Sequence, residues 1–395
     1  MQGFASILDT RRIAVRACLV ALSAVYANAQ DALFWGNLKA GPYAIGYRTF
    51  FALDESREYD GKSARPVLFQ VWYPAASADN PKLDYQAYFD VPHLDQHPQF
   101  SARLRSLTRD VACNDLFKRQ SEALLRPRER AAFNRLLATR TAGALNAREA
   151  PGRFPVVLYH SGAGGSFEEN SVLFEYLASF GYIIVSSAFQ SPVADSVSNN
   201  VGGIERSGPD LTFIANQTQK WANADPGKVA AMGHSAGAQM ILQWIGTSQC
   251  PALAVVSLDS TLEYDEFLGL HKYTLAAFEK LAPPKVPVLL FARASPKPRF
   301  SAFSEYLRFA PRYEAEASEL KHDDFLSHGF LGRALMRSQG TEKVRRSYEA
   351  VCRTVKAFLD SVLGGNGIGG TFPPPHSAAS PVSVRYRPAL ARPAP

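Results

Sequence analysis

Cysteine is scarce in this sequence, with four among 395 residues. No Cys-x-x-Cys pair occurs, and no cluster of cysteine and histidine has the spacing of metal ligands. We therefore expect no metal site, no cofactor and no thiol nucleophile. Three cysteines, Cys113, Cys250 and Cys352, lie beyond the N-terminal segment, and an odd number allows at most one disulfide bond within the chain.

A concentrated excess of positive charge is absent from most of the chain. The formal net charge is +7, of which residues 1–29 carry +2 and residues 364–395 carry +3. The remaining +2 is spread over basic residues that are mixed with acidic ones, without interleaved aromatic side chains. Nucleic-acid-binding domains gather Lys and Arg on one face, so we expect no nucleic acid as a partner.

The apolar stretch Ala17–Tyr26 is too short for a membrane-spanning helix, which needs about 20 residues. It follows three arginines and precedes the small-x-small sequence Ala27–Ala29, an order typical of a cleaved export signal. We expect residues 1–29 to be removed and the mature protein, beginning at Gln30, to be periplasmic or secreted. A buried N-terminal helix is the alternative. The segment Thr10–Arg12 leaves both the Sec and the twin-arginine route open.

Beyond the signal, the apolar pattern predicts one α/β catalytic domain over residues 30–363. Short, continuous apolar runs alternate with segments of helical length, which is typical of a parallel sheet covered on both faces. We expect a mostly parallel central sheet of about eight strands flanked by helices. The expected strands are Tyr43–Leu53, Pro66–Tyr73, Pro155–Tyr159, Tyr182–Ser186, Lys228–Met232, Leu253–Leu258, Val286–Ala292 and Tyr313–Leu320.

Three further segments complete the predicted organisation. Residues 101–147 combine apolar residues at helical spacing with many arginines, which predicts a helical insertion or cap. Lys343–Leu363 has the pattern of a closing helix. Residues 364–395 are rich in Gly, Pro, Ser and Ala and hold almost no core-forming residues, so we expect a disordered tail.

A candidate nucleophile lies between one of these strands and a helix. The stretch Gly233–Gly237 reads Gly-His-Ser-Ala-Gly, the G-x-S-x-G pattern that holds a serine hydroxyl on a sharp turn above a sheet. The pattern alone occurs by chance. Here Lys228–Met232 before it is strand-like and Ala238–Trp244 after it is helix-like, as the chemistry requires. We therefore predict Ser235 as a nucleophile.

A serine nucleophile needs a base and an acid that orients the base, in the chain order Ser, Asp or Glu, His. Asp259 follows the next strand directly, at the edge of the sheet where such sites are built. We predict it as the acid, with Glu263 and Asp265 in the following loop as second choices. The alternative role for Asp259 is to cap the turn at Ser260.

Three histidines follow this acid within the folded part of the chain. His271 comes before the next strand, which is too early. His322 follows the last expected strand directly and is our predicted base, with His328 as the alternative. His234 precedes the nucleophile, and we expect it to pack beside the turn.

Two backbone N–H groups must stabilise the oxyanion that forms during acyl transfer. One is expected from Ala236, the residue after the nucleophile. The other is expected from the glycine-rich turn His160–Gly165, with Ala163 as the donor and Gly162 or Gly164 as alternatives. A phosphate-binding loop would need a lysine and a spacing that this turn lacks.

Several segments share the motifs of one family, namely Gly41–Gly46, Pro66–Pro74, Leu158–Gly165, Gly233–Gly237, Asp259, His322 and Phe325. They resemble the platelet-activating-factor acetylhydrolases of the isoform II type and related exported bacterial esterases, within the α/β-hydrolase superfamily. The resemblance implies the α/β-hydrolase fold and cofactor-free, calcium-independent hydrolysis of short-acyl esters, phospholipid acetyl esters among them. It also implies Ala163 and Ala236 as oxyanion donors. His160 departs from the family by one position.

These observations predict a serine hydrolase that cleaves carboxylic esters through an acyl-enzyme on Ser235, with a small-molecule ester or a lipid as partner. An amidase, a peptidase or a dienelactone-type hydrolase would use the same triad, and a non-catalytic binding protein would keep only the fold. Contact of residues 101–147 with a membrane surface is a further hypothesis. Phe189, Tyr264 and Phe325 follow strand ends and either border the acyl site or pack in the core.

Overall fold

The structure is a computed structural model that describes residues 34–391 except 60, 62, 78–79, 190–200, 265–266, 268, 270, 294–305, 365–371 and 374–379. For residues 201–206 only the backbone is described. The expected export signal at residues 1–29 lies outside the described residues. Within them, no helix is long and apolar enough to cross a bilayer.

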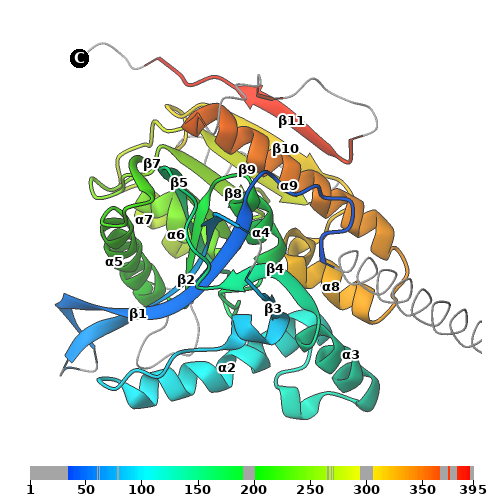
Figure 1. Ribbon diagram of the computed structural model, residues 1–395. Coiled ribbons are helices and arrows are strands. Elements are labelled where there is room, and N and C mark those ends of the chain that lie inside the picture. The colour runs from blue at the N-terminus through cyan, green and yellow to red at the C-terminus, as the bar shows by residue number, and fades with distance from the viewer. Residues whose placement is uncertain are drawn as a thin grey trace, which may run out of the picture.

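An eleven-stranded sheet runs through the described chain in the order β11-β10-β9-β8-β7-β5-β6-β2-β1-β4-β3 (Figure 1). The six neighbouring strands from β10 to β6 are all parallel. The outer pairs β10–β11, β6–β2, β2–β1 and β4–β3 are antiparallel, so the sheet is parallel at its centre and mixed toward its edges. Its strands are β1 (Ala44–Tyr59), β2 (Ser63–Ala75), β3 (Lys82–Asp84), β4 (Arg140–Leu145), β5 (Phe154–His160), β6 (Ile183–Ser187), β7 (Ala224–His234), β8 (Ala254–Leu258), β9 (Val288–Arg293), β10 (Arg312–Ala317) and β11 (Val382–Arg387).

The predicted number of about eight strands is wrong by three. All eight expected segments form strands, and the additional ones are β3, β4 and β11. These lie at or next to the two edges of the sheet. A strand there is covered less completely than a central one and does not need a continuous apolar run, which is why composition did not reveal it.

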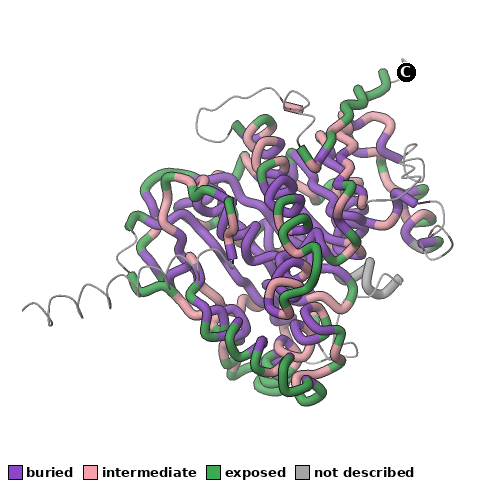
Figure 2. Tube along the Cα trace, turned by 90° about the vertical axis from the view of Figure 1, so that its right-hand side faces the viewer, coloured by how far each residue is buried: buried purple, intermediate pink, exposed green. Residues whose placement is uncertain are grey.

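Helices cover both faces of the sheet (Figure 1). α4, α8 and α9 contribute to one apolar core together with Val157 and Tyr159 of β5. α5, α6 and α7 contribute to the other, together with Val156 and Leu158. Successive β5 side chains therefore enter opposite cores, and β5, β6 and β8 are buried along their whole lengths. Buried residues fill the centre of the molecule (Figure 2). The helices are α2 (Pro98–Phe117), α3 (Pro127–Leu137), α4 (Ser171–Ser179), α5 (Val201–Thr218), α6 (Ala236–Trp244), α7 (Lys272–Phe278), α8 (Ser327–Leu335) and α9 (Thr341–Leu363), with short 3-10 helices η1 (Tyr85–Phe89), η2 (Glu122–Leu124) and η4 (His322–Phe325).

The expected helical cap at residues 101–147 contains α2 and α3 and packs against α8. The approach is close, because a Cβ on Gly332 would lie 2.5 Å from the carbonyl oxygen of Leu116. The prediction is wrong for the end of this segment. There β4 pairs in parallel with β1, with Gly143 opposite Ile45. The small residues of β4 carry little signal for either structure.

The tail predicted to be disordered contributes a strand, so that prediction is wrong for Val382–Arg387. β11 pairs along its whole length with β10 in antiparallel register. Val382 enters the core, and the ring of Tyr386 lies 5.0 Å from that of Tyr313. The alternation of Val and Tyr with polar residues in this short stretch is the signal that the low-complexity surroundings obscured.

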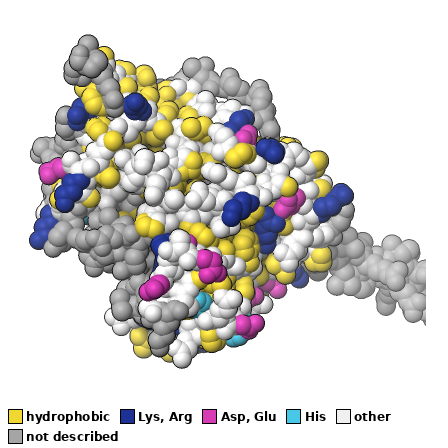
Figure 3. All heavy atoms as spheres, turned by 90° about the vertical axis from the view of Figure 1, so that its left-hand side faces the viewer, with side chains coloured by type: hydrophobic (Ala, Val, Ile, Leu, Met, Phe, Trp, Pro, Cys, Tyr) yellow, Lys and Arg dark blue, Asp and Glu magenta, His cyan; other side chains and the backbone are white. Residues whose placement is uncertain are grey.

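Charged side chains are dispersed over the face of the molecule that Figure 3 shows, with acidic residues among the basic ones. Cys113, Cys250 and Cys352 are free thiols. Burial raises the pKa of each of them, to about 12 for Cys113 and for Cys250. All three are therefore protonated and poorly nucleophilic near neutral pH.

Candidate active site

Ser235 occupies a sharp turn between β7 and α6. Its φ of 52° and ψ of −124° lie in a region that residues with a side chain rarely adopt. Both glycines of the motif are sterically required. A Cβ on Gly233 would lie 2.7 Å from the amide nitrogen of Ala238, and one on Gly237 would lie 2.2 Å from the carbonyl oxygen of His160.

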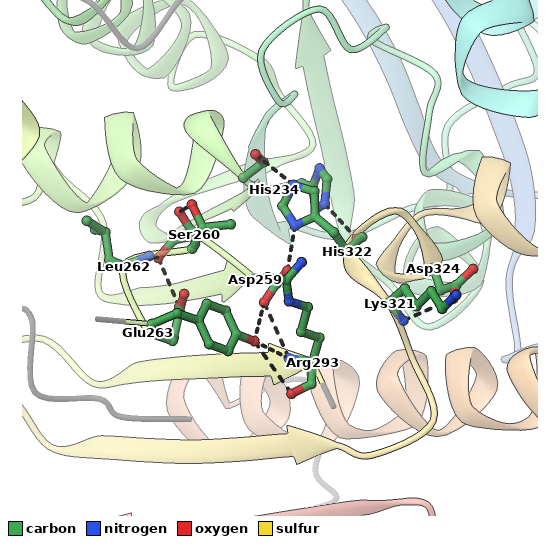
Figure 4. Close-up of polar contacts among 12 residues, drawn as sticks. His234, Asp259, Ser260, Leu262, Glu263, Arg293, Lys321, His322 and Asp324 are labelled. Atoms are coloured by element: carbon green, nitrogen blue, oxygen red, sulfur yellow. Dashed lines mark hydrogen bonds and ion pairs between the residues drawn. The ribbon is translucent and has the colours of Figure 1, made fainter. Parts of the chain in front are cut away.

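The fold brings Ser235, Asp259 and His322 together. Figure 4 shows Asp259 beside His322. Nε2 of His322 lies 3.0 Å from Oγ of Ser235, and its Nδ1 lies 2.5 Å from Oδ2 of Asp259. The three residues come from the turn after β7, the end of β8 and the start of η4. Because these parallel strands end at the same edge of the sheet, side chains distant in sequence meet there.

Asp259 is completely buried, and its carboxylate is held by several donors. Oδ1 accepts a hydrogen bond from the hydroxyl of Tyr264 at 2.7 Å and one from the N–H of Arg293 at 3.3 Å. Burial on its own raises the pKa of Asp259. The hydrogen bond and charge of His322, with the Tyr264 hydroxyl, outweigh burial and hold that pKa below its ordinary value. Asp259 is therefore ionised at neutral pH.

His234, which we expected to pack beside the turn, also contacts the loop that carries His322. Its Nε2 lies 3.1 Å from the backbone oxygen of His322, and the two rings are 4.6 Å apart. Burial, followed by repulsion from His322, lowers the pKa of His234 to about 3. The ring is neutral at neutral pH, so Nε2–H donates to that carbonyl.

Glu263, one of the second-choice acids, is bound to a serine rather than to the base. The carboxyl group of Glu263 is buried and accepts a hydrogen bond from Ser260 at 2.9 Å. Burial, and then the charge of Asp259, raises the pKa of Glu263 to about 8. Asp265 lies outside the described residues.

The other candidate histidines have separate partners. His271 lies 2.8 Å from the hydroxyl of Thr261 through its Nε2. His328 is buried between Asp115, 3.2 Å from its Nδ1, and Tyr85, 3.0 Å from its Nε2. Neither contacts the Ser235 hydroxyl.

In the glycine-rich turn after β5, one of the candidate N–H donors is already hydrogen-bonded. The N–H of Gly162 donates to the buried carboxyl group of Glu169 at 3.3 Å, and the carbonyl oxygen of Gly162 accepts from Gly165 at 3.1 Å. Ala163, at the exposed tip, has an N–H with no acceptor within the part of the chain described. Ala236 is the first residue of α6, so its N–H has no acceptor within the helix. The N–H of Gly162 is therefore already bonded, and Ala163 stays the predicted second donor.

The side chain of His160, the last residue of β5, is bound to partners outside the triad. Its Nδ1 lies 2.8 Å from the carbonyl oxygen of Ser161 and its Nε2 lies 2.9 Å from the hydroxyl of Ser207. Its ring stacks on Phe189 with a centroid distance of 3.7 Å. Phe189 therefore packs against His160, and Phe325 is likewise buried in the core.

Two residues that contact this site were not predicted as parts of it. The carboxyl group of Glu169 accepts the N–H of Gly162, and the hydroxyl of Tyr264, a residue expected to border the acyl site or pack in the core, donates to Asp259. The partners are seven and five positions apart, so each contact depends on the path of one irregular turn. The one signal in the sequence was that Tyr264 follows the predicted acid closely.

The arrangement suits proton transfer from a hydroxyl to an imidazole that an ionised carboxylate orients. Among the described residues, no three His, Cys, Asp or Glu side chains are grouped so that they would hold a metal ion. Each proton acceptor in the chain from Ser235 to Asp259 is within hydrogen-bond distance of its donor.

No protein-family model and no curated protein matches the chain. Among solved structures, it is similar to the ferulic acid esterase from Streptomyces cinnamoneus, with a TM-score of 0.59 and 18% sequence identity. The match covers 88% of this chain and 98% of the esterase chain. The two proteins therefore share a fold, a mixed α/β architecture, over most of their lengths.

Proposed function

We propose that the protein is a serine hydrolase of carboxylic esters that forms an acyl-enzyme on Ser235. The observation that carries this proposal is the continuous hydrogen-bonded chain from the Ser235 hydroxyl through His322 to the buried Asp259. A hydroxyl on a strained turn, with a base at 3.0 Å, is a costly arrangement for a protein that does no acyl transfer.

In the first half-reaction, Oγ of Ser235 attacks the ester carbonyl carbon while Nε2 of His322 accepts the hydroxyl proton. The negative charge moves to the carbonyl oxygen, where the N–H groups of Ala163 and Ala236 stabilise it. The tetrahedral intermediate then expels the alcohol, which takes the proton from Nε2, and an acyl-serine ester remains. Ionised Asp259 stabilises the imidazolium throughout.

In the second half-reaction, water attacks the acyl-serine and gives its proton to Nε2 of His322. Collapse of the second tetrahedral intermediate releases the carboxylic acid and returns the proton to Oγ of Ser235. No redox change and no metal are needed, and every proton is returned.

For the substrate we propose an ester with a short acyl chain, phospholipid acetyl esters being the finer possibility. The family resemblance supports the short acyl chain, and the similarity to a ferulic acid esterase supports an ester over an amide. A series of p-nitrophenyl esters of increasing acyl length, with p-nitroacetanilide and methyl ferulate, tests this choice. We expect the acetate to be cleaved fastest and the anilide slowest.

The decisive test of ester hydrolysis compares wild type with Ser235→Ala on p-nitrophenyl acetate. Loss of the nucleophile is expected to lower kcat by at least about 10³-fold. Ser260→Ala is the matched control, because this buried serine is adjacent to Asp259 yet donates to Glu263. Equal rates for wild type and Ser235→Ala would contradict the proposal.

We also propose that the enzyme works outside the cytoplasm after removal of residues 1–29. The arginine-rich start, the apolar stretch and the Ala27–Ala29 site support this. N-terminal sequencing of the protein recovered from the periplasm or medium of an expressing bacterium tests it. A mature chain that begins at Gln30 is expected, and an intact Met1 in the cytoplasm would contradict it.

A further inference from the structure

The triad carboxylate has two oxygens, and they face different partners. Oδ2 of Asp259 lies against His322. Oδ1 is turned toward the hydroxyl of Tyr264 and the backbone N–H of Arg293. Arg293 is the last residue of β9, the strand next to β8, and Figure 4 shows it beside Asp259. Because Asp259 is completely buried, these groups replace the water that an exposed carboxylate would bind.

The direction of the Tyr264 hydroxyl follows from its own hydrogen bonds. Its oxygen accepts the N–H of Arg293 at 2.6 Å, so its hydrogen must point elsewhere. Two acceptors are within reach, Oδ1 of Asp259 at 2.7 Å and the carbonyl oxygen of Arg293 at 3.5 Å. The shorter contact is to an ionised group and is the stronger one, so the hydroxyl donates to Asp259.

The ring of Tyr264 is held in place by its surroundings. The residue is buried, and the guanidinium carbon of Arg293 lies 4.8 Å from the ring centroid. Phe267 packs edge-on to the same ring at 6.1 Å. Burial, and then the charges of Asp259 and Glu263, raises the pKa of Tyr264 above its ordinary value, so the phenol keeps its proton.

The remaining titratable groups around Asp259 are on three other elements. His322 on η4 contacts Oδ2, and the ring of His234 at the end of β7 packs on His322. Glu263, in the loop after β8, is held protonated at neutral pH and adds no charge there. Among the described residues, His322 is the sole side chain within ion-pair distance of Asp259.

We propose that Tyr264 is a positioning residue of the catalytic triad, whose hydroxyl binds Oδ1 of Asp259 and thereby keeps Oδ2 directed at Nδ1 of His322. This inference rests on the proposed serine-hydrolase function. Tyr264 touches neither substrate nor Ser235 and acts only through Asp259. The same hydroxyl accepts the N–H of Arg293 and thereby joins the loop after β8 to the end of β9.

Tyr264→Phe removes the hydroxyl and keeps the ring. We expect kcat on p-nitrophenyl acetate to fall by about 10- to 100-fold, the size of one hydrogen bond to a charged group, while KM changes by less than about twofold, since ground-state binding is untouched. The lost donor leaves Asp259 with a less dispersed negative charge, which binds the His322 imidazolium more strongly. The acidic limb of the kcat/KM profile should therefore move to higher pH.

Site-specific replacement of Tyr264 by 3-fluorotyrosine keeps the fold and makes the phenol a stronger donor. The acidic limb should then move to lower pH, opposite to Tyr264→Phe. Tyr306→Phe is the matched control, because this buried tyrosine donates to the backbone oxygen of Leu242. It should lower the melting temperature without moving the pH profile. If both Tyr264 variants leave the acidic limb in place, the positioning role is refuted.

A second readout separates this inference from the proposed function. The proton between Nδ1 of His322 and Asp259 should give a low-field proton NMR resonance that is absent in Asp259→Asn. We expect Tyr264→Phe to shift this resonance and Tyr306→Phe to leave it unchanged. This measurement needs no turnover. An unchanged resonance in Tyr264→Phe overturns the inference even if Ser235-dependent hydrolysis is found, whereas a shifted one supports it even if the substrate is not an ester.

Discussion

Two turns at the same edge of the sheet bury carboxyl groups, and the pKa of Asp259 in one is shifted in the opposite direction from those of Glu168 and Glu169 in the other. In the turn after β8, Asp259 lies against a histidine, a phenol and a backbone N–H, and its pKa is lowered. In the turn after β5, Glu168 and Glu169 are as deeply buried, yet burial raises the pKa of both, to about 7 for Glu168.

The difference lies in the donors rather than in depth. Oε1 of Glu169 accepts a hydrogen bond from the hydroxyl of Tyr159 at 2.6 Å and one from the N–H of Gly162 at 3.3 Å. Among the described residues, no positively charged side chain lies within ion-pair distance of Glu169. Asp259 adds a histidine that becomes positively charged when it takes the serine proton. A buried carboxyl group is thus ionised only where a cationic partner and several donors converge.

The largest expected effect comes from neutralising the ionised acid. Asp259→Asn should lower kcat on p-nitrophenyl acetate by about 10³- to 10⁴-fold, because the imidazole loses both its orienting partner and its charge stabilisation. Glu263→Gln, four residues along and equally buried, should change kcat by less than about threefold. If the two variants are equally impaired, the assignment of the acid to Asp259 is wrong.

A smaller effect is expected in the turn after β5. Glu169→Ala leaves the Gly162 N–H and the Tyr159 hydroxyl without their acceptor, and disorder of the oxyanion turn should lower kcat by about 10- to 100-fold. Glu169→Gln keeps an acceptor oxygen and the neutral charge, so it should retain most of the activity. Binding of a trifluoromethyl ketone, which forms the oxyanion, should weaken in parallel with kcat. If Glu169→Gln lowers kcat as much as Glu169→Ala does, the site needs a negatively charged carboxylate at this position, and the neutral state of Glu169 is wrong.

The turn after β8 should also make the stability depend on pH, through Glu263. The folded-state pKa of Glu263 is about 8, above the unfolded value near 4.5, so folding binds a proton and stability falls as pH rises between these values. Glu263→Gln removes this dependence and should raise the melting temperature at pH 8 relative to pH 5, by about 2–4 °C for each kcal/mol regained. A shift of equal size at both pH values would contradict the pKa assignment.

The smallest expected effect concerns His160, the last residue of β5. Burial, against the opposing hydrogen bond to Ser161, lowers the pKa of His160 to about 4. Its folded pKa is below the unfolded value near 6.5, so protonation favours unfolding and stability is lost as pH falls through 6.5. His160→Gln should reduce the drop in melting temperature between pH 6.5 and pH 4.5. If the melting temperature of His160→Gln drops as much as that of wild type, other groups than His160 cause the loss of stability in acid.

The parallel centre of the sheet was predictable from sequence because its strands are buried on both faces and read as continuous apolar runs. Ser235 followed from the glycine spacing, and Asp259 and His322 from their places after successive strands. The edge strand β11 was missed because its alternation of Val and Tyr with polar residues is short and lies in a low-complexity tail. β4 was assigned to the helical cap because its small residues carry little signal for either structure.

Side-chain contacts within the two turns could not be predicted for a different reason. The bond between Tyr264 and Asp259 and the bond between Gly162 and Glu169 join residues five and seven positions apart in one turn. Each depends on the irregular path of that turn, which local periodicity does not encode. Residue type helps only afterwards, because a buried tyrosine hydroxyl must find an acceptor and a buried carboxyl group must find donors.

The central claim is that Ser235 is an activated nucleophile, and active-site labelling tests it most directly. A fluorophosphonate should modify one residue per chain, located at Ser235 by mass spectrometry of the digested protein, because only an activated serine reacts at a useful rate. His322→Gln should abolish the modification, and Ser260→Ala should leave it unchanged. Labelling that is absent in the folded wild-type protein, or that persists at another residue in Ser235→Ala, would contradict the account.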